Sequence, residues 1–341
     1  MRFIFKNKNL CFFILYCLKL ALSLQMDFKD KFMKVSILVP VYNVEKYFAR
    51  CLETMFSQTY SDIEYVFVND CTPDKSMHVL QEVLGKYPSR INSVKIIKNK
   101  ENLGIAIVRN ILLENATGEY VLFVDSDDWI ETNAIEKFVR KALESNADIV
   151  GCDYIEEYAD KQLVFKQSYP SDHIEAMKAM TLLRIKGVLW KLFIRREIIV
   201  HNDLYFVPEV QFGEDYIFCC KLFYYAKSFS CVNEALYHYV QYNPNNYSST
   251  NMDLRINSFS SAINIVESFY REKGVYDVLE TELLQRKFLS KSSYVLDAKK
   301  RNIKAWASYF PESNGAWRGL NYSWPNQLRF LLAEMVVKLF Y

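Results

Sequence analysis

Short apolar runs alternate with segments of helical periodicity from Val35 onward, and this alternation restricts the fold more than any other feature of the chain. The first run, Val35-Ser-Ile-Leu-Val-Pro40, has the pattern of a strand that is buried on both faces of a parallel sheet. Further strands are predicted at 63–68, 94–97, 120–124 and 148–152. Strands that alternate with helices predict an α/β fold with an open, mostly parallel sheet flanked by helices.

Helical patterns fill the intervals between these strands. In the first interval, apolar residues recur at helical spacing from Val44 to Phe56, and Asn43 stands where an N-cap belongs. Beyond residue 160 the alternation weakens, and helical patterns follow at 172–185, 214–226, 253–273 and 276–297. We therefore predict an α/β domain over residues 34–240 and a helical C-terminal region over residues 241–341.

Both ends of the chain leave alternatives open. Residues 1–33 include an apolar run, 10–24, that is shorter than the roughly 20 residues of a spanning helix. This extension is predicted to be an interfacial anchor, a signal-like segment or a misassigned start. The third alternative arises because Met33 is followed at once by Lys34 and a complete first strand. Residues 327–341 gather apolar side chains on one face, which fits either a membrane interface or a helix docked on the protein's own core.

The charge balance argues against one class of partner. The chain has 42 Lys and Arg against 40 Asp and Glu, a formal charge of +2, whereas a nucleic-acid-binding protein would show a strongly basic face. Hydrophobic residues make up 51% of the chain and aromatic residues 16%, which argues against disorder. We therefore expect a folded protein that does not bind nucleic acid.

Polar or turn-forming groups follow each of the first four predicted strands. Tyr42 and Asn43 follow the first strand, Asp70 follows the second, and Asn102 and Gly104 come after the third. In open α/β sheets, ligands bind beyond the carboxyl ends of the strands. We expect these groups to meet at one edge of the sheet.

The fourth strand ends in an acidic segment, Val124-Asp125-Ser126-Asp127-Asp128. Neighbouring carboxylates repel one another unless a hard cation such as Mg²⁺ or Mn²⁺ takes their oxygens as ligands. The alternative is that Asp125 or Asp128 caps a helix that starts near Glu131, although this would leave the other carboxylates unexplained. The segment therefore predicts a site for a divalent metal and a nucleotide diphosphate.

Two pairs of residues carry weaker signals for ligand binding. Asp70 could accept a hydrogen bond from a base N–H, and Tyr42 offers a flat face for stacking. Gly104 lets backbone N–H groups approach an anion, and Arg109 lies one turn further on. The ordinary roles of such residues are a turn cap, packing and a surface ion pair.

Glu214 and Asp215 place two carboxylates at the start of a later helix, where the helix dipole favours their ionised forms. An ionised carboxylate is what a general base requires. Helix capping explains the same residues equally well at this point.

Taken together, five motifs resemble those of the family 2 glycosyltransferases, which have the GT-A fold with a Rossmann-like sheet. They are Val35-Ser-Ile-Leu-Val-Pro-Val-Tyr-Asn43, the Asn69-Asp70 turn, Asn102-Leu-Gly104 with Arg109-Asn110, Gly118-Glu-Tyr-Val-Leu-Phe-Val-Asp-Ser-Asp-Asp128, and Glu214-Asp215. The resemblance covers about residues 34 to 240. It implies an inverting hexosyl- or N-acetylhexosaminyltransferase that uses a UDP-sugar and Mn²⁺ or Mg²⁺.

The resemblance also implies a setting and a set of roles. The acceptor would be a glycan or lipid-linked hydroxyl in the synthesis of surface polysaccharide, at the inner, cytoplasmic face of the cell membrane. The implied donor site consists of Pro40, Tyr42 and Asp70 for the uridine, Asn102 and Arg109 for the sugar diphosphate, and Asp125 and Ser126 for the ribose and phosphates, with Asn43 and Gly104 as further nucleotide-sugar contacts. The remaining roles fall on Asp127 with Asp125 as metal ligands, Asp215 as the base, Glu214 as a positioning group for the acceptor, and Trp190 as the acceptor floor or a core residue.

Three positions depart from the family pattern. Cys71 stands where Gly is common, Val108 replaces a usual Ala, and Val240-Gln241 lacks the basic residue that often follows the aromatic strand, so His238 is a substitute candidate for the diphosphate. Two other functions are weighed against transfer. A nucleotidyltransferase would need a Gly-rich, basic loop near the first strand, which is missing, and a catalytically silent glycan-binding protein would release no UDP.

Overall fold

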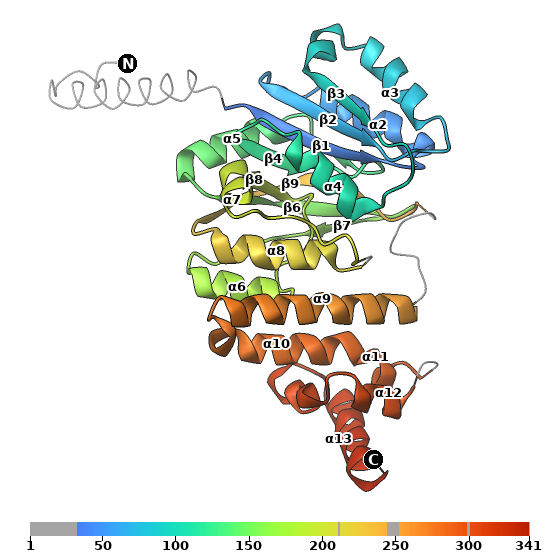
Figure 1. The fold of residues 1–341 in the computed structure, drawn as a ribbon, viewed down its shortest axis with the longest axis vertical. Coiled ribbons are helices and arrows are strands. Elements are labelled where there is room, and N and C mark those ends of the chain that lie inside the picture. Colours follow the sequence, from blue (N-terminus) through green and yellow to red (C-terminus); the bar gives the residue numbers. More distant parts are fainter. Residues whose placement is uncertain (1–32, 211, 244–251, 299–300, 341) are drawn as a thin grey trace, which may run out of the picture.

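The computed structural model describes residues 33–210, 212–243, 252–298 and 301–340, so the predicted N-terminal extension lies outside it apart from Met33. One sheet runs through the upper part of the molecule in Figure 1. Its strands are β1 (Val35–Val41), β2 (Ile63–Asn69), β3 (Val94–Lys98), β4 (Tyr120–Phe123), β5 (Trp129–Ile130), β6 (Ile149–Glu157), β7 (Gln162–Phe165), β8 (Leu192–Arg195) and β9 (Phe229–Val240).

The helices are α2 (Glu45–Phe56), α3 (Ser76–Gly85), α4 (Ile105–Glu114), α5 (Ala134–Ser145), α6 (His173–Thr181), α7 (Arg196–His201), α8 (Glu214–Tyr225), α9 (Met252–Glu272), α10 (Tyr276–Lys291), α11 (Ser293–Leu296), α12 (Ile303–Ser308) and α13 (Trp324–Phe340). Short 3₁₀ turns occur at η1 (Pro88–Ser93), η3 (Pro311–Ser313) and η4 (Ala316–Gly319).

The sheet confirms the predicted α/β class and adds strands that the sequence did not reveal. The strand order is β3-β2-β1-β4-β8-β6-β9-β5, with β7 beside β6. β1 pairs in parallel with β2 and β4, and β2 pairs in parallel with β3, as predicted. β8 is antiparallel to both β4 and β6, and β5 is antiparallel to β9, so the complete sheet is mixed. Strands as short as β5 and β8 carry too little periodicity to be found in a sequence.

Helices cover both faces of the sheet because β1 is apolar on both sides. Val35, Ile37 and Val39 pack with α2, α3 and α5, whereas Leu38 packs with α4, α6 and α8 on the opposite face. This two-sided burial is what a continuous apolar strand predicts. Below the sheet in Figure 1, α8, α6, α9 and α10 follow one another in layers.

The predicted helical C-terminal region shares its core with the α/β domain. Ala262 and Val266 of α9 and Leu279 of α10 belong to the same buried cluster as α6 and α8. A separate small core holds the last helices together around Trp306 and Phe330. Within the described part of the chain, no helix is long and apolar enough to cross a bilayer.

The predicted N-cap of α2 is wrong by one residue. Asn43 takes a left-handed conformation with φ 55°, and Val44 is the cap position, without a side-chain cap of its own. The N–H groups at the start of α2 are instead satisfied from the start of α3 and the loop before it, because Ser76 Oγ accepts from Val44 N at 3.1 Å and Asp74 Oδ2 accepts from Glu45 N at 2.9 Å. The loop therefore replaces the local cap.

Candidate active site

The carboxyl ends of β1 and β2 bring Tyr42 and Asp70 together, as predicted. The backbone N–H of Asp70 donates to Val41 O at 3.1 Å, which joins the two strand ends. Pro40 is buried, whereas the Tyr42 ring is 46% exposed just beyond it. The exposed ring remains available for the predicted stacking against a base.

Asp70 organises the loop after β3. It is 3% exposed, and its Oδ1 accepts from Asn99 Nδ2 at 2.7 Å and from Leu103 N at 2.9 Å. Its Oδ2 accepts from Gly104 N at 3.0 Å. The Gly104 N–H, predicted to approach a ligand anion, therefore meets the Asp70 carboxylate, which corrects that expectation. The loop leaves Asn102 exposed, and its contact with a sugar diphosphate remains a prediction.

Cys71 departs from the family pattern at a strained position. Its φ of 58° lies in the left-handed region, where glycine carries no steric penalty and other residues do. The frequent Gly at this place therefore has a backbone reason. The Cys71 thiol is exposed and donates to Lys100 O at 3.6 Å, which ties the second strand end to the third.

The acidic segment after β4 divides into one structural carboxylate and two that face the site. Asp128 is buried and accepts from Val240 N and from Tyr237 Oη, both at 2.7 Å. It therefore attaches the segment to β9 and does not cap a helix, since β5 intervenes before α5 begins at Ala134. Burial, followed by the charges of Asp127 and Asp125, raises the pKa of Asp128 well above its ordinary value.

Asp125 and Asp127 are the pair with oxygen atoms available to a cation. Asp127 Oδ2 accepts from Asn243 Nδ2 at 2.8 Å, and the Asp125 side chain is about a quarter exposed. Burial and the charge of Asp125 raise the pKa of Asp127 to about 6. Among the described residues, no three His, Cys, Asp or Glu groups converge into a ready cage. Two crowded carboxylates nevertheless fit Mg²⁺ or Mn²⁺, because such an ion completes its shell with water and phosphate oxygens.

Arg109 occupies the centre of the site instead of the surface. It is buried, its Nη1 donates to Glu214 Oε1 at 3.1 Å and to Asp215 Oδ1, and its Nη2 lies 3.6 Å from Asp125 Oδ1. Burial opposes its charge, yet the carboxylates of Asp215, Asp125 and Glu214 raise the pKa of Arg109. The alternative of an ordinary surface ion pair is therefore wrong. The buried Nε of Arg109 has no hydrogen-bond partner among the described groups.

The N-terminus of α8 presents Glu214 and Asp215 to this arginine. Burial raises the pKa of Asp215 to about 8, with Glu214 and Asp125 adding to the effect and Arg109 opposing it. Burial likewise raises the pKa of Glu214, against Arg109. The helix starts after Gly213, whose φ of 92° and close approach to α9 exclude a side chain, since a Cβ there would lie 2.8 Å from Ala262 Cβ. Asp215, a carboxylate with a raised pKa, therefore lies across Arg109 from Asp125 of the acidic segment.

Two predicted contacts are not supported. The Trp190 ring is 3% exposed and stacks on Tyr237 with 4.4 Å between the ring centroids. It therefore packs in the core beneath Tyr237, and the prediction that it forms the floor of the acceptor site is not supported. His238 is buried, with Nδ1 2.7 Å from Glu157 Oε1 and Nε2 3.0 Å from Glu131 Oε1. Because both ring nitrogens are engaged, His238 does not replace the missing basic residue at the diphosphate.

Two residues of the site were missed by sequence reasoning. Tyr237 bonds both Asp128 and, through its Oη, the backbone N–H of Asp125 at 3.1 Å, so one hydroxyl holds both ends of the acidic turn. Asn243 holds Asp127. The family resemblance implies an aromatic strand before Val240, but nothing in the sequence says which of its side chains points toward the acidic segment.

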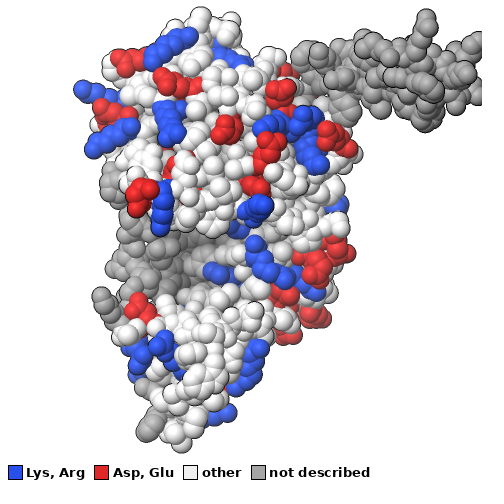
Figure 2. Space-filling model, turned by 180° about the vertical axis from the view of Figure 1, so that it is seen from behind, with Lys and Arg blue, Asp and Glu red and all other residues white. Residues whose placement is uncertain are grey.

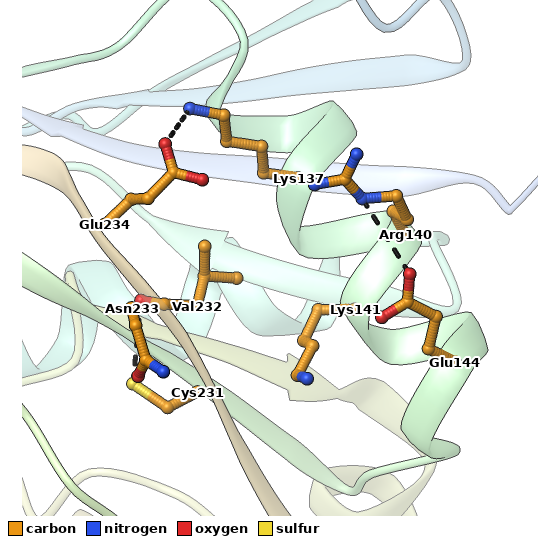
Figure 3. A pocket seen from close by; sticks show the side chains of 8 residues that line it. All are labelled: Lys137, Arg140, Lys141, Glu144, Cys231, Val232, Asn233 and Glu234. Atoms are coloured by element: carbon orange, nitrogen blue, oxygen red, sulfur yellow. Dashed lines mark hydrogen bonds and ion pairs between the residues drawn. The ribbon is translucent and has the colours of Figure 1, made fainter.

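A cavity of about 290 Å³ lies elsewhere, between α5 and residues 231–234 of β9, and none of the predicted site residues lines it. Figure 3 shows Lys137 reaching toward Glu234, with their charged atoms 2.5 Å apart, and Arg140 reaching toward Glu144 at 3.9 Å. These carboxylates already balance two of the lining cations. The chemistry described above therefore lies at the strand ends and not in this cavity.

Comparison with known proteins places the fold. Residues 36–199 match the model of glycosyl transferase family 2. The putative glycosyltransferase EpsH of Bacillus subtilis is 36% identical over 214 residues, which are 60% of this chain and 60% of EpsH, so the chain spans less than two thirds of that relative. The crystal structure of residues 1–349 of Staphylococcus aureus TarS with UDP-GlcNAc superposes with a TM-score of 0.65 at 22% identity, covering 83% of this chain and 81% of that one. A mannosyltransferase of Pyrobaculum calidifontis, solved with GDP-Man and Mn²⁺, gives 0.51 at 16% identity over 93% and 86% of the two chains.

Proposed function

Because residues 36–199 make the chain a member of glycosyl transferase family 2, we propose that it is an inverting enzyme that moves a sugar from UDP to a hydroxyl group. The acceptor is a glycan or a lipid-linked glycan in the synthesis of surface polysaccharide. TarS, a poly(ribitol-phosphate) β-N-acetylglucosaminyltransferase 29% identical over 216 residues, supports a surface-polymer acceptor and an N-acetylhexosamine donor.

One observation carries the proposal: Arg109 contacts Asp215 and lies 3.6 Å from Asp125. A single guanidinium group therefore separates Asp215, the predicted base, from Asp125 in the acidic segment that is predicted to bind the metal and the nucleotide. A transfer reaction requires this proximity, because the acceptor oxygen must reach the anomeric carbon while the diphosphate is held on the other side. A helix cap would require no such partner.

Asp215 is the group that moves a proton in this scheme. It takes the proton from the acceptor hydroxyl while that oxygen attacks the anomeric carbon. The bond from that carbon to the diphosphate oxygen breaks on the opposite face, and UDP leaves with the electron pair, which inverts the anomeric centre. A pKa near 8 suits this role, since a general base is most effective when its pKa lies near the working pH.

The other residues hold the donor. Tyr42 and Pro40 support the uracil, Ser126 lies beside the ribose and phosphates, and the partnerless Nε of Arg109 fits an oxygen of the sugar diphosphate. Asp125 and Asp127 would hold Mn²⁺ or Mg²⁺, which supplies Lewis-acid stabilisation of the departing diphosphate. Glu214 is proposed to position the acceptor, and its Oε1 also accepts a hydrogen bond from Arg109 Nη1 at 3.1 Å.

The proposed setting is the cytoplasmic face of the cell membrane, where a UDP-sugar and a lipid-linked acceptor would both be available. This setting follows from the family resemblance. It is independent of the chemistry at Asp215 and can be tested separately.

Replacing Asp215 by Asn tests the base. We expect Asp215→Asn to lower turnover by at least about 100-fold, since general-base help typically contributes about 10² to 10⁴ in rate. UDP release would be measured with Mn²⁺ and a panel of UDP-sugars and glycan acceptors, and UDP binding would be followed as a rise in melting temperature. The exposed Asp160→Asn provides the same chemical change on the surface and should behave as wild type.

Two results would contradict the proposal in different ways. Full turnover by Asp215→Asn would remove the base assignment but leave the donor site intact. A wild-type chain that shows no thermal shift with any UDP-sugar in the presence of Mn²⁺ would contradict the donor assignment itself.

A further inference from the structure

Helix α13 lies at the end of the molecule away from the sheet (Figure 1), and several of its apolar side chains are exposed to solvent. Trp324 and Leu339 are 73% and 72% exposed, and Leu332 and Met335 are about half exposed. Leu328, Leu331 and Val336 are exposed as well. We call this set of residues the α13 face. Contiguous exposed apolar faces mark interaction sites, whereas apolar side chains scattered singly over a surface do not.

The α13 face lies opposite the side through which the helix docks on its own protein. Phe330 and Ala333 are buried in the small C-terminal core, and Val337 packs against it. At about 100° per residue, these positions fall on one side of the helix, while Leu328, Leu332 and Leu339 fall on the other. Docking on the chain's own core, the alternative raised for this segment, therefore accounts for one side of α13 and leaves the α13 face uncovered.

The charges of α13 are distributed asymmetrically. Its cations, Arg329 and Lys338, flank the α13 face on its two sides. Its carboxylate, Glu334, points to the core side, where Trp317 Nε1 donates to it at 2.7 Å and Arg318 pairs with it at 2.7 Å. Figure 2 shows the same end of the molecule from behind, with Lys and Arg outnumbering Asp and Glu around a largely uncharged surface.

We propose that the α13 face lies in the interfacial region of an anionic lipid membrane, with the helix parallel to the surface. The apolar side chains enter the boundary between headgroups and acyl chains, and Arg329 and Lys338 extend to the phosphates on either side. The helix has 17 residues, fewer than the roughly 20 that cross a bilayer. This inference does not depend on the proposed chemistry.

A second copy of the chain fits the α13 face less well. Two such helices packed against each other would bring cations to an interface in which α13 offers no carboxylate of its own, because Glu334 is engaged on the core side. An anionic bilayer supplies the missing negative charge at the depth where the cations emerge.

The test uses the full chain in sedimentation with lipid vesicles. One set of vesicles contains equal parts of phosphatidylglycerol and phosphatidylcholine, and the other contains phosphatidylcholine alone. The test variant carries Leu332→Gln, Met335→Gln and Leu339→Gln. Its matched control also replaces three exposed apolar residues by Gln, but on other elements. These substitutions are Ile91→Gln, Val164→Gln and Val200→Gln.

We expect the α13 variant to bind the mixed vesicles about 100-fold more weakly, at roughly fivefold for each of the three apolar side chains that no longer enters the bilayer. The control variant should bind as wild type does. Arg329→Gln with Lys338→Gln should weaken binding about 25-fold on the anionic vesicles and little on phosphatidylcholine alone, since each cation contributes about fivefold at an anionic surface. Unchanged thermal response to UDP would show that the variants are folded.

Equal binding of wild type and the α13 variant would overturn the proposal, because the α13 face would then contribute nothing to the affinity for vesicles. The affinity would instead be assigned to residues 1–32, which are present in both chains. A dimer in light scattering that the α13 variant converts to a monomer, without a change in vesicle binding, would instead assign the α13 face to a second copy. Loss of UDP release with intact vesicle binding would contradict only the proposed function.

Discussion

Replacing Arg109 by Met tests whether this buried guanidinium holds the site together by charge. Methionine keeps the apolar length of the arginine side chain but removes the positive charge, so that Asp125, Glu214 and Asp215 are left facing one another. At 3.1 Å and 3.6 Å, each attraction amounts to about 5 kcal/mol with an effective dielectric constant of 20, and desolvation of the arginine offsets most of this. Removing one partner of a buried ion pair costs about 3–5 kcal/mol of unfolding free energy.

The cost should depend on pH with a definite sign. In the wild type, the raised pKa of Asp215 means that the folded state keeps a proton that the unfolded state loses above its ordinary pKa. This contribution to stability is therefore present at low pH and is lost as the pH rises toward 8. Without Arg109 the carboxylates bind protons even more strongly, so the deficit of Arg109→Met should be small near pH 5.5 and complete near pH 8.5.

Thermal unfolding at both pH values, with EDTA to remove divalent metals, measures this difference. We expect the melting temperature of Arg109→Met to fall by roughly 6 to 20 °C at pH 8.5, at about 2–4 °C per kcal/mol. Arg140→Met removes an exposed arginine that lies 3.9 Å from Glu144 and should change little at either pH. An equal deficit at both pH values would refute the charge argument and leave packing as the cause.

Three further results are expected. The rate constant kcat/KM should rise with pH to a plateau above about 8 as Asp215 loses its proton, and Glu214→Gln should move this limb to lower pH because a like charge is removed. Tyr237→Phe should cost about 1–3 kcal/mol in chemical unfolding by leaving a buried carboxylate oxygen unpaired, and it should raise KM for the donor more than it lowers kcat; an unchanged KM would count against a positioning role. Gly213→Ala should lower the melting temperature because of its positive φ and the contact with α9, whereas Gly85→Ala, with open space around its Cβ, should not; equal melting temperatures would contradict the close approach.

The first half of the fold could be predicted because its signals are local. A buried parallel strand such as 35–41 has a continuous apolar pattern, and the polar groups at its end follow within a few residues. The strand ends then locate Tyr42, Asp70 and Asp125 at one edge of the sheet. The antiparallel strands β5 and β8 were missed because two and four residues are too few to show a period.

The roles of the individual side chains were less accessible. In the sequence, Trp190 and His238 cannot be distinguished from aromatic residues that line a ligand site, yet both are buried. Asp128 looks like its neighbours Asp125 and Asp127, yet it is the one that bonds β9. Sequence spacing does not say which of several adjacent polar groups turns inward.

The amino-acid sequence by itself determined the α/β class, the strand ends that carry polar groups, and the helix that begins with Glu214 and Asp215. These features depend on local periodicity and on short turns. Only the tertiary structure decided that Arg109 lies between Asp125 and Asp215, that Tyr237 secures the acidic turn, and that α13 keeps an apolar face in solvent. Each of these depends on contacts between residues far apart in the chain, or on which side of a helix finds a partner, and neither is encoded in local spacing.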